Sequence, residues 1–181
     1  MSMRPLKSVF ISAGHSNVDP GACANGRREA DIAVEFRNMV SFYLSRDGIP
    51  HDLDGSGTDN YPLARAAQIA RAHDIAVEFH CNAAGSAATG TEALTGGKDV
   101  ALSVALTKAV STALGIANRG AKPENAGQHS RLAFVQAGGV ILEVIFITST
   151  FDLLAYDARR WLAAQAVSGV IARAARGEAV G

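Results

Sequence analysis

Four residues of the sequence stand where reactive side chains could meet. His15 follows a short β-rich run, His80 ends another such run, Glu29 opens a helical stretch, and Glu143 interrupts an apolar run over residues 140–145. In open α/β sheets, ligands bind in the crevice beyond the carboxyl ends of the strands. Two histidines and an acid at strand ends can therefore converge on one crevice.

Glu29 is an acid on a stripe that otherwise faces the core. It lies three residues before Ile32 and four before Ala33, so the three share one face of the predicted helix. A carboxylate there is costly to bury unless a metal, another cation or hydrogen-bond donors satisfy it. The alternative is an exposed Glu29 that only stabilises the positive end of the helix.

Glu143 stands between Leu142 and Val144 in a run typical of a central strand. Burial would raise the pKa of its carboxyl group. A pKa near neutrality is what a general acid/base needs. The alternatives are an edge-strand position facing water, or an ion pair with an arginine such as Arg131.

As a set, the four residues have the composition of a metallohydrolase site. Two histidines and one carboxylate form a common catalytic zinc triad that leaves a fourth position for water or substrate. A separate glutamate beside that water completes the site. Taken singly, His15 and His80 could each be structural histidines, and the spacing alone fits no compact motif. We interpret the other three histidines as surface or loop residues, namely His51, His73 and His129.

The remaining pattern alternates short apolar runs with longer helical stretches, as in α/β domains. It predicts strands at residues 8–12, 49–53, 75–79, 89–95, 132–135 and 140–145. It predicts helices over 28–45, 62–73, 99–114 and 157–176, with a loop over 116–130. We therefore expect residues 1–181 to form a single three-layer α/β domain, with a core of about 7–176 and a mainly parallel twisted sheet flanked by helices.

Composition excludes several classes of protein. Hydrophobic residues make up 48% of the 181 residues and charged residues 19%, which indicates a globular chain. Seventeen basic residues balance seventeen acidic ones, so nucleic acid and anionic membrane are not expected partners. No apolar run approaches the ~20 residues needed to span a bilayer. The apolar run at residues 9–11 is too short for a Sec signal, so we expect synthesis in the cytoplasm without Sec export.

The two cysteines, Cys23 and Cys81, do not make a disulfide framework, and we expect two unpaired thiols. Cys81 follows His80 directly. Adjacent residues of a strand point to opposite faces, so Cys81 is not expected to be a metal ligand.

Several motifs are shared with one known family. They are Gly14-His15 followed by Asp19-Pro20-Gly21, then Arg28-Glu29, then Glu78-Phe79-His80-Cys81-Asn82-Ala83, and finally Val140-Ile141-Leu142-Glu143. In this order they resemble the zinc N-acetylmuramoyl-L-alanine amidases found among bacterial cell-separation enzymes and phage endolysins. The resemblance runs from about residue 9 to 175. The chain departs from it at Ser16-Asn17, which replace glycines, at Gln136, which replaces an arginine, and at Val144-Ile145-Phe146.

The resemblance implies one Zn²⁺ per chain held by His15, Glu29 and His80, with Glu143 as the catalytic acid/base and Asn82 as a possible substrate contact. The reaction would be hydrolysis of the amide that joins N-acetylmuramic acid to L-alanine in peptidoglycan. We expect a monomer without membrane insertion or a separate cell-wall-binding domain. It would act on the wall from the periplasm, as a phage or prophage endolysin released by holin lesions. The alternatives are a non-catalytic peptidoglycan- or metal-binding module, or an unrelated zinc peptidase or deacetylase.

Overall fold

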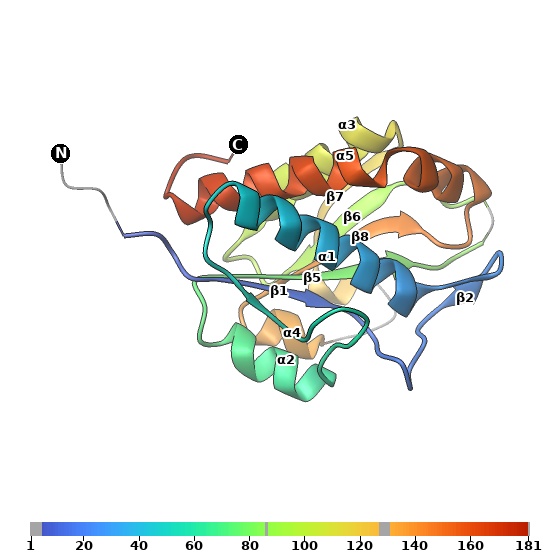
Figure 1. Ribbon diagram of the computed structural model, residues 1–181. Helices are drawn as coiled ribbons and strands as arrows, with labels where there is room; N and C mark the ends of the chain where they lie inside the picture. The colour runs from blue at the N-terminus through green and yellow to red at the C-terminus, as the bar shows by residue number, and fades with distance from the viewer. Residues whose placement is uncertain (1–4, 86, 127–130, 181) are drawn as a thin grey trace.

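A six-stranded sheet forms the middle layer of the molecule (Figure 1). The computed structural model describes residues 5–85, 87–126 and 131–180. The strands are β1 Val9–Ala13, β4 Asp52–Leu53, β5 Ile75–Asn82, β6 Thr91–Thr95, β7 Asn118–Pro123 and β8 Val140–Phe146. Their order is β4, β1, β5, β8, β6, β7. The first four pair in parallel, while β6 joins β8 antiparallel and carries β7 parallel to itself. The expected mainly parallel sheet is confirmed.

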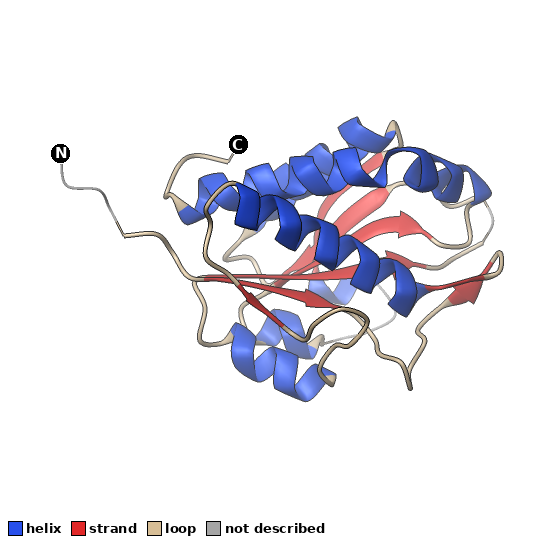
Figure 2. Cartoon of the chain, in the orientation of Figure 1, coloured by secondary structure: helices blue, strands red, loops and turns tan. Residues whose placement is uncertain are grey.

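Helices cover both faces of this sheet (Figure 2). One face carries α1 Glu29–Arg46, α3 Val100–Leu114 and α5 Thr150–Ala175, and the other carries α2 Leu63–Ala70 and α4 Ala133–Gln136. A small hairpin of β2 Cys23–Ala24 and β3 Arg27–Arg28 precedes α1, and a 3-10 turn, Glu124–Ala126, follows β7. The three-layer arrangement is therefore as expected. Within the described ranges, no helix is both long and apolar enough to cross a membrane.

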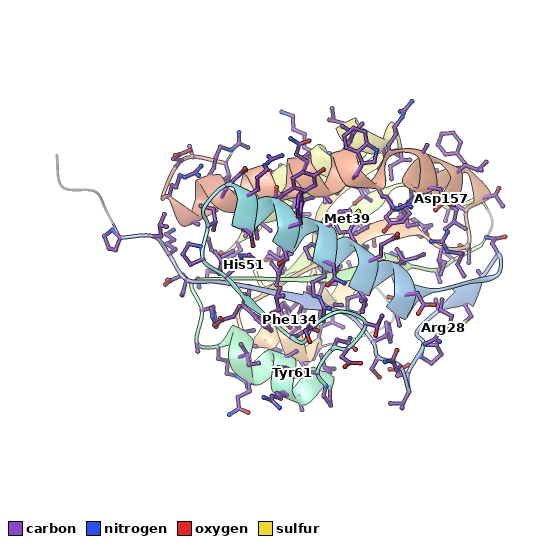
Figure 3. All side chains as sticks on the ribbon, in the orientation of Figure 1. Arg28, Met39, His51, Tyr61, Phe134 and Asp157 are labelled. Carbon is purple, nitrogen blue, oxygen red and sulfur yellow. The ribbon has the colours of Figure 1, made fainter. Side chains whose placement is uncertain are left out.

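The alternation of side chains along β5 decides which residues face which layer. Val77, Phe79 and Cys81 belong to the large core beneath α1, α3 and α5. The residues between them face the side of α2 and α4, where Phe134 packs under the sheet (Figure 3). Since α2 and α4 are only eight and four residues long, this side leaves room for His80 at the carboxyl end of β5.

Two predicted elements are wrong. Residues 132–135 were expected to form a strand, but the structure has the helix α4 there, with the Phe134 ring 6.2 Å from the ring of Phe10. Periodicity cannot separate a short buried strand from a short buried helix. The expected loop at 116–130 contains strand β7. This strand lies at the sheet edge, where residues are polar and partly exposed, so no apolar pattern marks it.

The last helix begins earlier than expected. α5 starts at Thr150, because the Ser149 hydroxyl accepts a hydrogen bond from the Asp152 backbone N–H at 3.2 Å and caps the helix. Asp157, where the helix was expected to begin, instead lies within α5 and forms an ion pair with Arg27 at 2.9 Å. The C-terminal end of α3 is as expected. This helix stops before Gly115, which adopts the left-handed conformation with a φ of 73°.

Candidate active site

His15 sits just past β1 in a strained backbone conformation. Its φ is 65°, a region that residues other than glycine rarely occupy. The Asn60 side-chain amide donates to the carbonyl of Ala13 at 2.9 Å and also to the carbonyl of His15, and Gly14 N donates to the Phe79 carbonyl at 2.8 Å. These contacts fix the turn that aims the imidazole. Strain of this kind gathers at functional sites, where the surrounding structure holds it.

Glu29 is the first residue of α1 and is 4% exposed, so the alternative of an exposed helix-end charge is wrong. Its two carboxylate oxygens accept backbone hydrogen bonds from Ala22 at 2.9 Å and Cys81 at 3.0 Å. The same oxygens lie 3.1 Å from Nε2 of His15 and 2.9 Å from Nδ1 of His80. Burial opposes ionisation, but the hydrogen bonds from the two histidines outweigh it and hold the pKa of Glu29 well below its usual range.

His80 completes a cluster of three potential metal ligands. One ligand atom each from His15, Glu29 and His80 lies within 4.8 Å of the other two. The carboxylate raises the pKa of His15 through their hydrogen bond. Burial lowers the pKa of His80, but its hydrogen bonds to Glu29 and Glu78 dominate and raise it well above 6.5. Both pKa shifts favour the protonated imidazoles, whose positive charge offsets the charge of Glu29 in the metal-free cluster.

The backbone around the cluster is built to let these rings approach. A Cβ atom on Gly14 would lie 2.3 Å from Nε2 of His80. A Cβ on Gly21 would lie 2.5 Å from the His15 ring and 2.6 Å from the Glu29 carboxylate. Two imidazole nitrogens and one carboxylate oxygen are a donor set that suits zinc and related transition metals. The residues present therefore fit a bound metal ion.

Glu143 faces the cluster from β8. Its register partner is His80 on one side and Glu92 of β6 on the other. Among the described residues, its Oε2 atom is buried without a hydrogen-bond partner. Burial raises its pKa to about 7. Both alternatives are wrong, since β8 is a central strand and Arg131 donates instead to Gln136 at 3.0 Å.

A cavity of about 390 Å³ is lined both by the three potential metal ligands and by Glu143. Asn82 lines the same cavity, and both ends of its amide are held. Its Nδ2 donates to Glu92 at 2.8 Å, and its Oδ1 accepts from the Ala83 backbone at 2.8 Å. The side chain is thus fixed at the cavity wall, and each end retains capacity for one more hydrogen bond.

Sequence reasoning missed a charged group beside Glu143. Glu92 accepts hydrogen bonds from Arg119 Nε at 2.6 Å and from Lys122 Nζ at 2.7 Å. These bonds outweigh burial and lower its pKa. An acid inside a predicted strand could have signalled Glu92. Nothing could have signalled its partners, which belong to the strand that was expected to be a loop.

The other histidines lie apart from the cluster. His51 contacts Ser41 and the Ile49 carbonyl, each at 2.8 Å, at the opposite end of α1 from Arg28 (Figure 3). His73 hydrogen-bonds Asp52 at 3.0 Å. Both lie in loops and are half-buried. The prediction for residue 129 falls outside the described residues.

The cysteines are as expected. Cys23 is exposed, Cys81 is buried, and the structure contains no disulfide among the residues it describes. The Cys81 side chain packs in the core beneath α1, on the face opposite His80, so only its backbone reaches Glu29.

Comparison with known proteins identifies the family to which this chain belongs. Residues 9–173 match the model of the N-acetylmuramoyl-L-alanine amidase family. A solved structure of a candidate N-acetylmuramoyl-L-alanine amidase from Neisseria meningitidis is 43% identical, with a TM-score of 0.86 over 93% of this chain and 95% of that one. The protein YqiI of Bacillus subtilis (strain 168) is 28% identical over 81% of this chain and 73% of its own length. The endolysin of Bacillus phage SPP1 is 37% identical over 81 residues, or 42% of this chain and 30% of the endolysin. The chain therefore belongs to the N-acetylmuramoyl-L-alanine amidase family and is an enzyme of that class.

Proposed function

We propose that this protein uses zinc to hydrolyse the amide between N-acetylmuramic acid and L-alanine in peptidoglycan. The observation that carries the proposal is one cavity that holds the three-ligand cluster and the carboxylate of Glu143, whose Oε2 has no hydrogen-bond partner in the described part of the chain. His15, Glu29 and His80 would hold the ion. When bound, zinc supplies Lewis acidity, which polarises a carbonyl group and makes a nearby water molecule more acidic.

Glu143 has the properties of the general base. Its Oε2 is free to accept a proton, and its pKa of about 7 allows it both to take and to release one near neutral pH. It would remove a proton from the attacking water while the oxygen bonds to the amide carbon. It would then deliver that proton to the departing nitrogen of L-alanine. The hydroxyl of the water molecule thereby ends on the lactyl carboxyl group, and its proton ends on the free amine.

Asn82 is our candidate for a substrate contact. Its amide is already oriented by Glu92 and by the Ala83 backbone, so it can offer a hydrogen bond to the substrate without further ordering. All the proposed groups come from one chain. The site therefore needs no second copy, which supports action as a monomer.

Two other functions fit the residues less well. A binding module would have no use for a carboxylate oxygen such as Oε2 of Glu143, which is buried without a hydrogen-bond partner among the described residues, since such an atom costs free energy. An aminopeptidase with two co-catalytic metals needs more ligands than the single three-residue cluster found among the described residues. The likeness to a phage endolysin over 81 residues favours an endolysin that acts on the wall from the periplasm after holin release.

Digestion of purified sacculi tests the reaction. The zinc-loaded protein should release peptides with new L-alanine amino termini and leave glycan strands that gain no reducing ends. A glycosidase would create reducing ends, a peptidase would expose other amino termini, and a deacetylase would release acetate. Any of these patterns, without new L-alanine termini, would contradict the proposal.

A further inference from the structure

Glu78 is a second buried carboxylate at His80, on the side of the ring away from Glu29. It is 2% exposed and lies two residues before His80 in β5, so both side chains leave the same face of the sheet. Its Oε1 lies 3.0 Å from Nε2 of His80. The imidazole is thus held at both nitrogens, with Glu29 at Nδ1 and Glu78 at Nε2.

A buried chain of hydrogen bonds fixes Glu78 in turn. The Ser12 hydroxyl lies 3.0 Å from Oε2 of Glu78 and 3.1 Å from Oδ2 of Asp54, and it donates its single proton to one of the two at a time. Asp54 also accepts from the Ala13 backbone at 3.0 Å and forms an ion pair with Arg37 at 2.6 Å. Ser12, Asp54 and Arg37 are each 0% exposed. The chain therefore runs from α1 through the segment after β4 and through β1 to the ring of His80.

Arg37 is a rigid end point for this chain. Besides Asp54, its guanidinium donates to Asn38 at 2.9 and 3.2 Å and to the carbonyls of Asp59 and Gly57 at 3.0 and 3.2 Å. All these acceptors lie on α1 or in the segment that follows β4. An arginine satisfied on every side cannot turn away, so Asp54 and the groups it holds stay in place.

The two sides of the His80 ring have different chemistry. Nδ1 points into the cluster with Glu29 and His15, where a metal would lie. Nε2 points to Glu78, whose neighbours are the buried groups just described. A neutral imidazole carries one N–H, and a carboxylate at one nitrogen keeps the N–H there and leaves the lone pair on the other. Ligating histidines are commonly oriented by a carboxylate in this way.

We propose that Glu78 is a positioning residue for the metal centre. By accepting a hydrogen bond from Nε2–H of His80, it selects Nδ1 as the metal ligand and fixes the plane of the ring, while Ser12, Asp54 and Arg37 anchor Glu78. This inference rests on the metal site of the proposed function. It adds a residue that contacts neither substrate nor metal.

Zinc affinity of the metal-free protein tests this role without using activity. Zn²⁺ alone is titrated in competition with a chromogenic chelator at one pH. We expect Glu78→Ala to bind zinc roughly 10–100-fold more weakly than the wild type. Glu78→Gln keeps a carbonyl acceptor of the same shape but without the charge, so it should lose less, roughly 3–10-fold. If Glu78→Ala does not fold, Glu78→Gln decides the outcome.

Asp52→Asn is the matched control. Asp52 also holds a histidine, His73, through a carboxylate contact of 3.0 Å, but neither belongs to the cluster. We expect this variant to keep the wild-type zinc affinity.

Nitrogen-15 NMR of the zinc-loaded wild type gives a second readout, one that a purely structural role would not produce. It should show His80 protonated at Nε2 and coordinated through Nδ1. Coordination through Nε2 would overturn the inference, as would wild-type zinc affinity in folded Glu78 variants. Failure of the wild type itself to bind zinc would overturn both this inference and the proposed function.

Discussion

At the scale of single residues, Glu143 and Glu29 differ in what surrounds their carboxylates and therefore in their pKa values. Glu29 is surrounded by donors, and its pKa falls well below the usual range. Burial dominates for Glu143, whose Oε2 has no partner among the described residues, and its pKa rises to about 7. These pKa values suit the first to remain a fixed negative charge and the second to carry a proton. Their environments thus separate the proposed ligand from the proposed base.

Glu143→Gln should abolish most turnover while preserving the fold. Gln cannot take a proton, so we expect activity to fall roughly 10²-fold or more. Because Oε2 of Glu143 is buried and has no hydrogen-bond partner among the residues that the structure describes, removal of the charge should leave the unfolding free energy unchanged or higher at pH 8. Zinc content, melting temperature and amide cleavage measured on one preparation check these expectations. Near-normal turnover in a folded, zinc-loaded variant would end the proposed mechanism.

The pH dependence should follow the charge around Glu143. As the base it must be ionised, so activity should fall as the pH drops through its pKa. Burial raises this pKa most, the charges of His80 and His15 lower it, and those of Glu29 and Glu92 raise it. Glu92→Gln should therefore move the acid limb of kcat/KM to lower pH. Glu35→Gln is the control, because the Glu35 carboxylate pairs with Arg160 at 3.0 Å and does not line the cavity of Glu143. Equal profiles for both variants would contradict the assignment.

Glu29→Gln separates a metal ligand from a helix-end charge. As a proposed ligand, Glu29 should be needed for zinc binding, so the variant should lose most bound metal and activity. A charge that acted only on the helix dipole would be worth under about 1 kcal/mol and would leave zinc in place. Metal analysis after gel filtration distinguishes the two. Asp31→Asn, an exposed acid in the same helical turn, should retain its zinc.

At the scale of elements, Asp152 joins two strands and a helix through hydrogen bonds. Asp152, in the first turn of α5, is fully buried. Its carboxylate accepts hydrogen bonds from Gly90 N at 2.8 Å, from Phe146 N at 3.0 Å and from the Thr89 hydroxyl. It therefore joins the start of β6, the end of β8 and the start of α5. These contacts hold in register the two strands that carry Glu92 and Glu143.

Asp152→Asn should lower the unfolding free energy by about 1–2 kcal/mol, because the amide oxygen can still accept from Gly90 N and Phe146 N but lacks the charge that strengthens both hydrogen bonds. Urea denaturation measures the loss. Asp157→Asn, further along α5, removes a half-exposed carboxylate paired with Arg27, and it should cost less than about 1 kcal/mol. Equal effects from the two substitutions would show that the Asp152 contacts add nothing to stability.

At the scale of the whole molecule, metal and proton compete for one cluster that joins β1, α1 and β5. Zinc at about 100 times its Kd should stabilise the fold by about 3 kcal/mol, which corresponds to roughly 5–10 °C in Tm for a domain of this size. Differential scanning calorimetry with and without a chelator measures this shift. A Tm unaffected by metal removal would argue against a zinc ion held by three protein ligands.

The increase in Tm that zinc binding causes should become larger as the pH rises. In the metal-free fold, the pKa values of His15 and His80 lie above 6.5. A raised pKa contributes stability that is fully present below the unfolded value and is lost as the pH rises through the folded value. The metal-free protein should therefore lose stability from about pH 6.5 upward, where zinc binding becomes stronger. A Tm difference that narrows with rising pH would contradict this.

The sequence by itself determined the features that depend on local pattern. Hydrophobic periodicity gave the α/β class, the mainly parallel sheet and the first helix with Glu29 on its inner face. The placement of His15 and His80 at predicted strand ends and of Glu143 within a predicted strand indicated a common site. Their side chains now line one cavity.

Only the tertiary structure decided which distant residues meet. Glu78 reaches Ser12 across 66 positions, and Asp54 reaches Ser12 across 42. Glu92 meets cations of a strand that had no apolar pattern. The hydrophobic pattern of a strand predicts which face of the sheet each residue occupies. It does not predict which strand lies beside it, and that neighbour decides which side chains the residue contacts. The antiparallel pairing of β6 with β8 thus sets Glu92 against Glu143.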